Sequence, residues 1–362
     1  MIELLHAATG GGLSSEAWAA LVEDDRILGF SQDVPGALAQ VGDIHIGVLR
    51  SVDRSRGTGS VLLVGGQETL LDLPRIGPRL VEGSRLLVQV QRPAQGSKRA
   101  KVGTRIVLDG RASSVVLTGS PEQLHTEVQA AATKDAAAEK ETGQLSAIAE
   151  AVKSAAGRAS EPARIRGGRG CVADLLFRFP DALPTSVQCD SRNAADALQR
   201  SLSDDPVGSG ISVAYAPLRE WRVSAGDLQA MIEDAFEPRH GLPAGGSILI
   251  EQGETLTAID VNTGSAESNS GAERLAIETN RNAAIEIARQ VRCLNLAGNI
   301  VIDFVGMRAK GEQRELVDRL RAAFGPDPAQ PWIGAMSPIG LVEMSRRRLG
   351  RGPVRRLTAP RS

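Results

Sequence analysis

The last third of the chain alternates between the hydrophobic periods of strands and of helices. The segments 247–251 (SILIE) and 256–261 (LTAIDV) are short apolar runs around a glycine-containing turn, which predicts two adjacent strands. Residues 273–298 carry apolar side chains at helical spacing, residues 299–304 (NIVIDF) predict a buried strand, and residues 312–325 predict a second helix. Strand, helix, strand and helix in this order predict a sheet with its functional groups at the carboxyl ends of the strands.

Residues 42–119 have the pattern of an all-β module. Short β-branched or leucine-rich runs alternate there with Gly, Ser and Pro. The runs are 44–52 (IHIGVLRSV), 59–66 (GSVLLVGG), 84–92 (SRLLVQVQR) and 104–110 (TRIVLDG). Four or five short strands with a basic loop near the end predict a small closed barrel of the OB type.

The remaining segments predict a mixed α/β fold around this barrel. Residues 1–41 contain strand-like runs around the acidic turn EDD, which favours a hairpin. Residues 120–162 are rich in Ala, Glu, Lys and Gln, so we expect one or two surface helices and a linker with little to bury. Residues 163–242 mix strand and helix patterns, and one helix is opened by Ser224 and closed near Gly241.

Composition narrows the class of protein. With 362 residues, 42% hydrophobic and 23% charged, the chain is long enough for two or three modules with cores of their own. No apolar run approaches 18 residues, and the start MIELLHAATG lacks the features of a secretory signal, so we expect a cytoplasmic protein without a membrane span. The three cysteines are scattered without a CxxC pair, which argues against zinc and against a disulfide framework.

Positive charge is clustered although the net charge is only −1. Residues 344–362 contain seven arginines and no acid, and a second cluster runs through residues 92–105. Each cluster alone is equally consistent with a solvated surface or a frayed tail. Two such clusters on a near-neutral chain favour a polyanionic partner.

Two predicted strands end on aspartate. Asp260 ends LTAID and Asp303 ends IVID, 43 residues later with one helix between them. A βαβ crossover brings both carboxylates to the same edge of one sheet, where they repel each other unless a cation lies between them. Mg²⁺ suits such a site, because it prefers oxygen ligands and is held by one or two carboxylates plus substrate phosphate. The alternative is that each aspartate caps a turn, and Asn262 likewise either orients a water or phosphate or makes a turn.

Three strings in this region closely resemble the catalytic part of the ribonuclease E/G family. They are 245–264 (GGSILIEQGETLTAIDVNTG), 278–307 (ETNRNAAIEIARQVRCLNLAGNIVIDFVGM) and 339–350 (IGLVEMSRRRLG). The similarity runs from about Ile232 to Gly350 and includes the spacing of the two aspartates. Residues 42–119 resemble the family's S1-type OB barrel, most clearly at LVEGSRLLVQVQ and GSKRAKV.

The resemblance implies a domain organisation. Residues 1–41 and 163–242 would form an RNase H-like part, residues 42–119 an inserted S1-like barrel, and residues 243–350 a DNase I-like catalytic part. Residues 120–162 would be an Ala-rich helical linker in place of the family's 5′-sensor, and residues 351–362 a basic tail.

The resemblance also implies an activity. In the family, two aspartates bind Mg²⁺, which activates a water to cut single-stranded RNA and leaves a 5′-phosphate on the downstream product. The implied catalytic residues are Asp260, Asn262 and Asp303, of which Asp260 and Asp303 hold the metal, with Mn²⁺ as an alternative ion. Lys98 falls where the family places an RNA-contacting lysine. The cations expected to bind RNA are Lys98, Arg99, Lys101 and Arg346.

The sequence departs from the family at four places. Residues 42–119 contain no Phe, Trp or Tyr on which a base can stack, and Leu70 lies where a ring is expected. The Arg-Thr pair of the 5′-sensor is absent from the chain, which predicts cleavage indifferent to 5′-phosphorylation. The CPxC zinc link between protomers is also absent, so any oligomer must form differently. Gly306 replaces an acid near the second aspartate.

Three functions are compatible with these residues. The favoured one is a compact Mg²⁺-dependent endoribonuclease, because Asp260, Asn262 and Asp303 are all retained. The second is a non-catalytic RNA-binding or regulatory protein on the same scaffold, motivated by the missing sensor and rings. The third is a nuclease acting on DNA, since the catalytic sheet alone does not distinguish ribose from deoxyribose.

Overall fold

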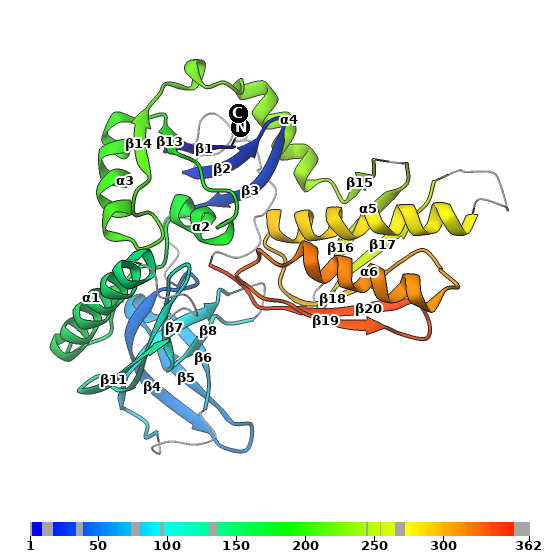
Figure 1. The fold of residues 1–362 in the computed structure, drawn as a ribbon. Coiled ribbons are helices and arrows are strands. Elements are labelled where there is room, and N and C mark those ends of the chain that lie inside the picture. The colour runs from blue at the N-terminus through cyan, green and yellow to red at the C-terminus, as the bar shows by residue number, and fades with distance from the viewer. Residues whose placement is uncertain are drawn as a thin grey trace, which may run out of the picture.

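The computed structural model describes residues 2–8, 17–33, 39–73, 80–94, 98–129, 136–243, 245–253, 255–264 and 272–350. Figure 1 shows three parts: an N-terminal sheet with its helices, a barrel, and a C-terminal sheet with two helices. The basic tail predicted at residues 351–362 lies outside the described residues. None of the helices described has the length and apolar character needed to cross a membrane.

The N-terminal sheet is assembled from two segments on either side of the barrel. Its strand order is β14-β13-β1-β2-β3; β1 to β3 are antiparallel, β13 runs parallel to β1, and β14 runs parallel to β13. The strands are β1 (Ile2–Ala7), β2 (Trp18–Glu23), β3 (Arg26–Gln32), β13 (Ser186–Cys189) and β14 (Ser212–Tyr215). The hairpin predicted within residues 1–41 is confirmed as β2 and β3.

Helices cover both faces of this sheet. Leu4 packs in one core cluster with α2 (Cys171–Arg178) and α3 (Arg192–Asp204), whereas Leu5 packs in another with α4 (Ala225–Phe236). Because both faces are covered, nearly every residue of β1 and β2 is buried. Ser224 caps α4 as predicted, by accepting a hydrogen bond from the Asp227 N–H. The helix ends at Phe236, earlier than predicted, because the chain enters a strand at Arg239.

The predicted barrel is confirmed as a closed ring of five strands, consistent with the OB type, but the run at residues 104–110 that was predicted as one of its strands lies in a separate three-stranded sheet. β4 pairs with both β5 and β7, and β8 joins β6 to β7, so the ring has no gap. The strands are β4 (Ile44–Asp53), β5 (Thr58–Leu62), β6 (Glu68–Asp72), β7 (Arg85–Arg92) and β8 (Lys101–Gly103), with a 3₁₀ turn at Val64–Gly66. Gly47 lets β4 bend across the ring, since a Cβ there would lie 2.5 Å from Cγ1 of Val61.

The segment predicted as a surface helix and linker is packed against the barrel. A small antiparallel sheet of β9 (Ile106–Asp109), β10 (Ser114–Ser120) and β11 (Gln123–Gln129) precedes α1 (Ala136–Arg158). β12 (Ala163–Arg166) then pairs with β4. The expectation that this segment buries little is wrong, because alanines at helical spacing let α1 approach the sheet closely. The buried residues of α1 in the shared core are Leu145, Ala149, Val152 and Ala156.

The C-terminal sheet has six strands in the order β15-β16-β17-β18-β20-β19, and β17 and β18 are parallel neighbours. The strands are β15 (Arg239–Gly241), β16 (Ser247–Gln252), β17 (Thr257–Asn262), β18 (Gly298–Asp303), β19 (Trp332–Met336) and β20 (Leu341–Arg346). α5 (Ala272–Cys293) connects β17 to β18, and α6 (Lys310–Ala323) follows β18, as predicted. Figure 1 shows both helices on the same side of the strands.

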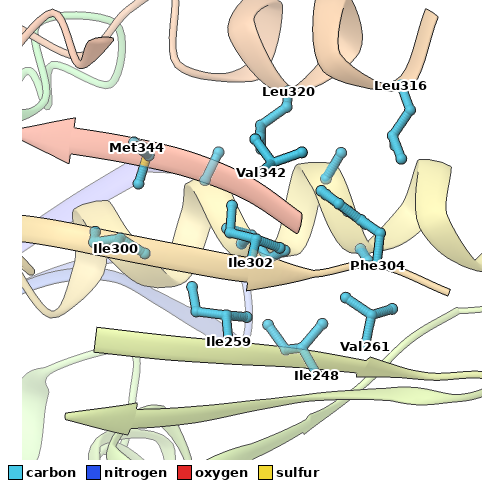
Figure 2. Packing of buried hydrophobic residues seen from close by; sticks show 14 of the residues in the cluster. Ile248, Ile259, Val261, Ile300, Ile302, Phe304, Leu316, Leu320, Val342 and Met344 are labelled. Atoms are coloured by element: carbon cyan, nitrogen blue, oxygen red, sulfur yellow. The ribbon is translucent and has the colours of Figure 1, made fainter. Parts of the chain in front are cut away.

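This one-sided cover explains the alternation along the strands. Ile259, Ile300 and Ile302 are buried and pack with Leu316 and Leu320 of α6 (Figure 2). The residues between them point to the other face, on which none of the described helices packs. The sheet therefore offers one open face on which polar side chains reach solvent.

A buried ion pair joins the N-terminal and C-terminal sheets. The Arg178 guanidinium on α2 donates to Asp174 Oδ2 at 3.0 Å and to the Phe30 carbonyl at 3.1 Å. Its other terminal nitrogen donates to the carbonyls of Arg292 and Cys293 at the end of α5, at 2.9 and 3.0 Å. One arginine thus satisfies carbonyls at a helix end that have no intrahelical donor, and holds α5 in place.

Candidate active site

Asp260 and Asp303 are direct neighbours on the open face of the C-terminal sheet. The parallel pairing of β17 and β18 places them opposite each other in register. Adjacent strands lie about 4.8 Å apart, so two carboxylates in register are close enough to share one cation. Both side chains are exposed, because the buried residues Ile259 and Ile302 point to the helices.

The placement of Asp303 differs from the sequence prediction in one respect. Residues 299–304 read as a buried strand, which places the carboxylate in an apolar environment. Only alternate residues, Ile300 and Ile302, are fully buried, and Asp303 faces solvent. Within the described residues, neither Asp303 nor Asp260 is held by a basic side chain. The pair is therefore open to a ligand from solvent.

Asn262 belongs to the same group of side chains. It lies two residues beyond Asp260 on β17, so it points to the same face, and its Nδ2 donates to Asp260 Oδ2 at 2.6 Å. This bond fixes the orientation of the Asp260 carboxylate. The second N–H and the carbonyl oxygen of the amide still have hydrogen-bonding capacity for a water or a phosphate.

The chemistry of these side chains fits Mg²⁺ or Mn²⁺. Two carboxylates and one amide oxygen are hard oxygen ligands, and Mg²⁺ keeps several waters and takes one or two carboxylates plus substrate phosphate. Among the described residues no group of three His, Cys, Asp or Glu side chains is arranged to hold a metal. A cation at Asp260 and Asp303 would therefore depend on water and substrate for its remaining ligands.

The cations predicted on the barrel lie at its surface. Lys98 and Arg99 are exposed, and Lys101 is partly exposed on β8. Arg99 pairs with Glu68 at 3.1 Å and Lys101 pairs with Asp72 at 2.5 Å, so acids of β6 partly offset both charges. Lys98 carries no such partner within the described residues and is the strongest candidate of the three for a phosphate contact.

Arg346 does not belong to the surface on which it was predicted. It is only 2% exposed, and its guanidinium pairs with Asp327 through bonds of 2.7 and 3.1 Å. It also donates to the Asn295 side chain at 3.1 Å and to the Leu296 carbonyl at 2.7 Å. Because its donors are engaged inside the protein, a contact between Arg346 and RNA does not fit this structure. Its neighbour Arg347 is the exposed member of the run.

Three further cations near the aspartates were not singled out from the sequence. Arg308 lies in the loop after β18, and Lys310 and Arg314 lie on the first turns of α6. They line a cavity that begins one residue beyond Asp303. The sequence signal for them was three cations within seven residues, shortly after the strand that ends at Asp303. That these cations line a cavity is visible only in the structure, where the β19–β20 turn forms its other wall.

The comparisons with known proteins all point to ribonucleases of one family. The profile of the Ribonuclease E/G family matches residues 121–349. Ribonuclease E of Escherichia coli (strain K12) is 47% identical over 122 residues, which are 34% of this chain and 12% of that protein. Ribonuclease E of Nostoc sp. is 43% identical over 123 residues, 34% of this chain and 18% of that protein.

A longer but weaker similarity extends over the barrel. Ribonuclease G of Escherichia coli (strain K12) is 27% identical over 349 residues, which cover 88% of this chain and 71% of that protein. The stretches matched in the two ribonuclease E proteins span less than a fifth of their length.

Proposed function

The chain belongs to the ribonuclease E/G family, and from this premise we propose that it is an endoribonuclease that cuts single-stranded RNA with the help of Mg²⁺. The observation that carries the proposal is the register of Asp260 and Asp303 on one open sheet face. Two carboxylates in register repel each other, and a cation between them would relieve this repulsion.

The roles of the residues follow from their placement. Asp260 and Asp303 would hold the ion, which when bound supplies a water of lowered pKa and neutralises charge on the phosphate. Asn262 would keep Asp260 in position through its 2.6 Å hydrogen bond and offer its other amide groups to the scissile phosphate. The open face leaves room for an extended strand, and Lys98 would contact that strand from the barrel.

The resemblance assigns the remaining features of the proposal. The N-terminal sheet corresponds to an RNase H-like part, the barrel to an S1-like part and the C-terminal sheet to a DNase I-like part. We expect a cytoplasmic enzyme, and any oligomer would form without a zinc link, since the three cysteines at 171, 189 and 293 are separate and buried.

The metal requirement gives the first test. Purified protein is expected to cleave a 5′-labelled, A/U-rich single-stranded RNA in Mg²⁺ and to stop when EDTA is added, because the bare carboxylates cannot activate water. Mn²⁺ is expected to restore cleavage. A DNA strand of the same sequence, run in parallel, decides whether the substrate is RNA. Cleavage that continues unchanged in EDTA contradicts the proposed mechanism.

Phosphorylation at the 5′ end is expected not to matter. The chain contains no Arg-Thr pair, and α1 with the small β9–β11 sheet occupies residues 106–158. We expect equal kcat/KM, within about twofold, for 5′-monophosphorylated and 5′-hydroxyl forms of one RNA. The two substrates are to be compared in single-turnover reactions. A strong preference for the monophosphate would show that another phosphate sensor exists.

A non-catalytic RNA-binding protein is the second candidate. It is motivated by the barrel, whose residues 42–119 contain no aromatic ring for stacking. This candidate predicts that the pure protein binds the RNA in Mg²⁺ and leaves it intact over hours. The same cleavage assay therefore separates the two functions.

A further inference from the structure

A cavity of about 920 Å³ opens at the carboxyl end of β18, beside the aspartate pair. It is formed by the loop at residues 304–308, the first turns of α6 and the β19–β20 turn at residues 335–340. Its volume lies in the range typical of ligand pockets. The lining starts at Phe304, the residue after Asp303, so the cavity and the aspartates share one edge of the sheet.

The charge of this cavity is strongly positive. Arg308, Lys310 and Arg314 line it, and none of the three side chains forms an ion pair among the described residues, although the Arg308 backbone N–H donates to Glu273 Oε1 at 2.8 Å. The remaining arginine, Arg321, is paired with the only acid of the lining, Asp318, at 3.0 Å. Three uncompensated cations in one concave site attract an anion with more than one charge.

The start of α6 adds to this positive potential. The helix begins at Lys310, and its N-cap residue Ala309 provides no side-chain hydrogen bond to the first turn. Free N–H groups at a helix start bind phosphate, and the helix dipole acts in the same direction. The backbone and the three side chains therefore favour the same class of ligand.

The rest of the cavity is apolar. Met307, Val317 and Met336 contribute to its lining, and Ile339 at the β19–β20 turn is 79% exposed. Cationic groups next to an apolar surface match a nucleotide, whose phosphates are charged and whose base has an apolar face.

We propose that this cavity binds one nucleotide of the RNA strand, with its two flanking phosphates on Arg308, Lys310 and Arg314 and its base against Ile339. The proposal rests on the proposed function, because the aspartate pair marks where the scissile phosphate lies. Asp303 faces the open side of the sheet and Phe304 the helix side, so an RNA strand that crosses the open face would reach the cavity by turning around the carboxyl end of β18. The site would supply the base contact that the ring-free barrel does not offer.

The main test measures the affinity for RNA with a variant that binds the RNA without cutting it. The background is Asp303→Asn, and the probe is a fluorescein-labelled single-stranded 13-mer RNA in Mg²⁺, measured by anisotropy at several salt concentrations. Arg308→Gln/Lys310→Gln/Arg314→Gln is expected to raise Kd about tenfold or more. The slope of log Kd against log salt is expected to fall by about 1.4, since the site would neutralise two phosphates and each phosphate of a single strand contributes about 0.7.

Arg319→Gln is the matched control, because Arg319 is an exposed arginine on the same helix that does not line the cavity. It is expected to leave the affinity and the salt slope unchanged. A second pair of variants, at Gly306, removes no contact, since a Cβ built there meets nothing within 4 Å beyond its chain neighbours. Only Gly306→Asp of this pair adds a negative charge. Gly306→Asp is expected to weaken binding severalfold, and the isosteric Gly306→Asn is not.

The outcomes separate this site from the proposed function. If the triple variant binds RNA like the Arg319→Gln protein while wild type cleaves RNA, the cavity site is wrong and the function stands. If the triple variant loses affinity but wild type cuts nothing, the site stands and the hydrolytic function is wrong. If Asp303→Asn protein binds no RNA at all, the cavity site is wrong, and cleavage by wild type alone then decides the function.

The base contact is tested with modified strands. RNAs that each carry one abasic nucleotide are compared on Asp303→Asn protein with and without Ile339→Ser. One position is expected at which removal of the base weakens binding severalfold, and Ile339→Ser abolishes that difference. If no position behaves in this way, the cavity recognises phosphates only and the base part of the proposal is overturned.

Discussion

Asp303→Asn is expected to lower kcat for RNA cleavage by about a thousandfold or more while the RNA remains bound. Asparagine has the same shape as aspartate but carries no negative charge, so it removes half of the charge that holds a cation between β17 and β18. The fold should not suffer, because Asp303 is exposed and the substitution deletes no buried contact. Single-turnover cleavage and the Kd for RNA, measured on the same preparation, are the two readouts.

Glu251→Gln is the control for this variant. Glu251 is an exposed acid on β16, and its register partner Ala258 precedes Asp260 by two residues, so it lies on the same open face. Loss of its charge is expected to change kcat less than twofold. Asp260→Asn should match the loss seen for Asp303→Asn, since the two carboxylates act on one ion. Cleavage by Asp303→Asn above about a tenth of the wild-type rate would rule out the shared-cation site.

The aspartate pair illustrates what the sequence can predict. The alternation of apolar residues fixed the strand containing Asp260, and the intervening helix indicated a parallel neighbour ending at Asp303. The register of the two aspartates was not predicted; in the structure a slip by one residue would turn Ile302 to solvent. What could not be predicted was the exposure of Asp303, because it depends on whether helices cover one or both faces.

Two other features could not be predicted from the sequence because they depend on tertiary packing. Half of the buried residues of α1 are alanines, and their small size obscures the hydrophobic stripe that Leu145 and Val152 complete. The cavity beside Asp303 is closed by the β19–β20 turn, which contributes Ile339 from a distant part of the chain. In both cases the signal arises only when segments distant in sequence are packed together.

Arg346 shows how charge along the sequence can mislead. It stands in the run Arg346, Arg347 and Arg348, but strand alternation turns it inward. Asp327 is 1% exposed and lies opposite the guanidinium, so the two ions are buried together. A basic run at the end of a strand therefore contains both surface and interior residues, and only the pairing of β18 with β20 distinguishes them.

Arg346→Met is expected to lower the free energy of unfolding by about 3–5 kcal/mol, which is the usual cost of breaking a buried ion pair. The substitution leaves the Asp327 carboxylate and the Leu296 carbonyl without their donor in the interior. Urea unfolding at neutral pH measures the loss. Arg347→Met is the control: Arg347 is 54% exposed and lies 3.9 Å from Asp109, so less than about 1 kcal/mol is expected.

The double variant Arg346→Met/Asp327→Leu separates charge from packing. Removal of both ions leaves no unpaired charge, so it is expected to recover most of the stability that Arg346→Met loses. Folded Arg346→Met protein should bind RNA as tightly as wild type, because the guanidinium is already engaged by Asp327 and Asn295. If Arg346→Met unfolded like wild type but lost RNA affinity, the guanidinium would have to reach the surface in the RNA complex, and β20 would then be part of the RNA path.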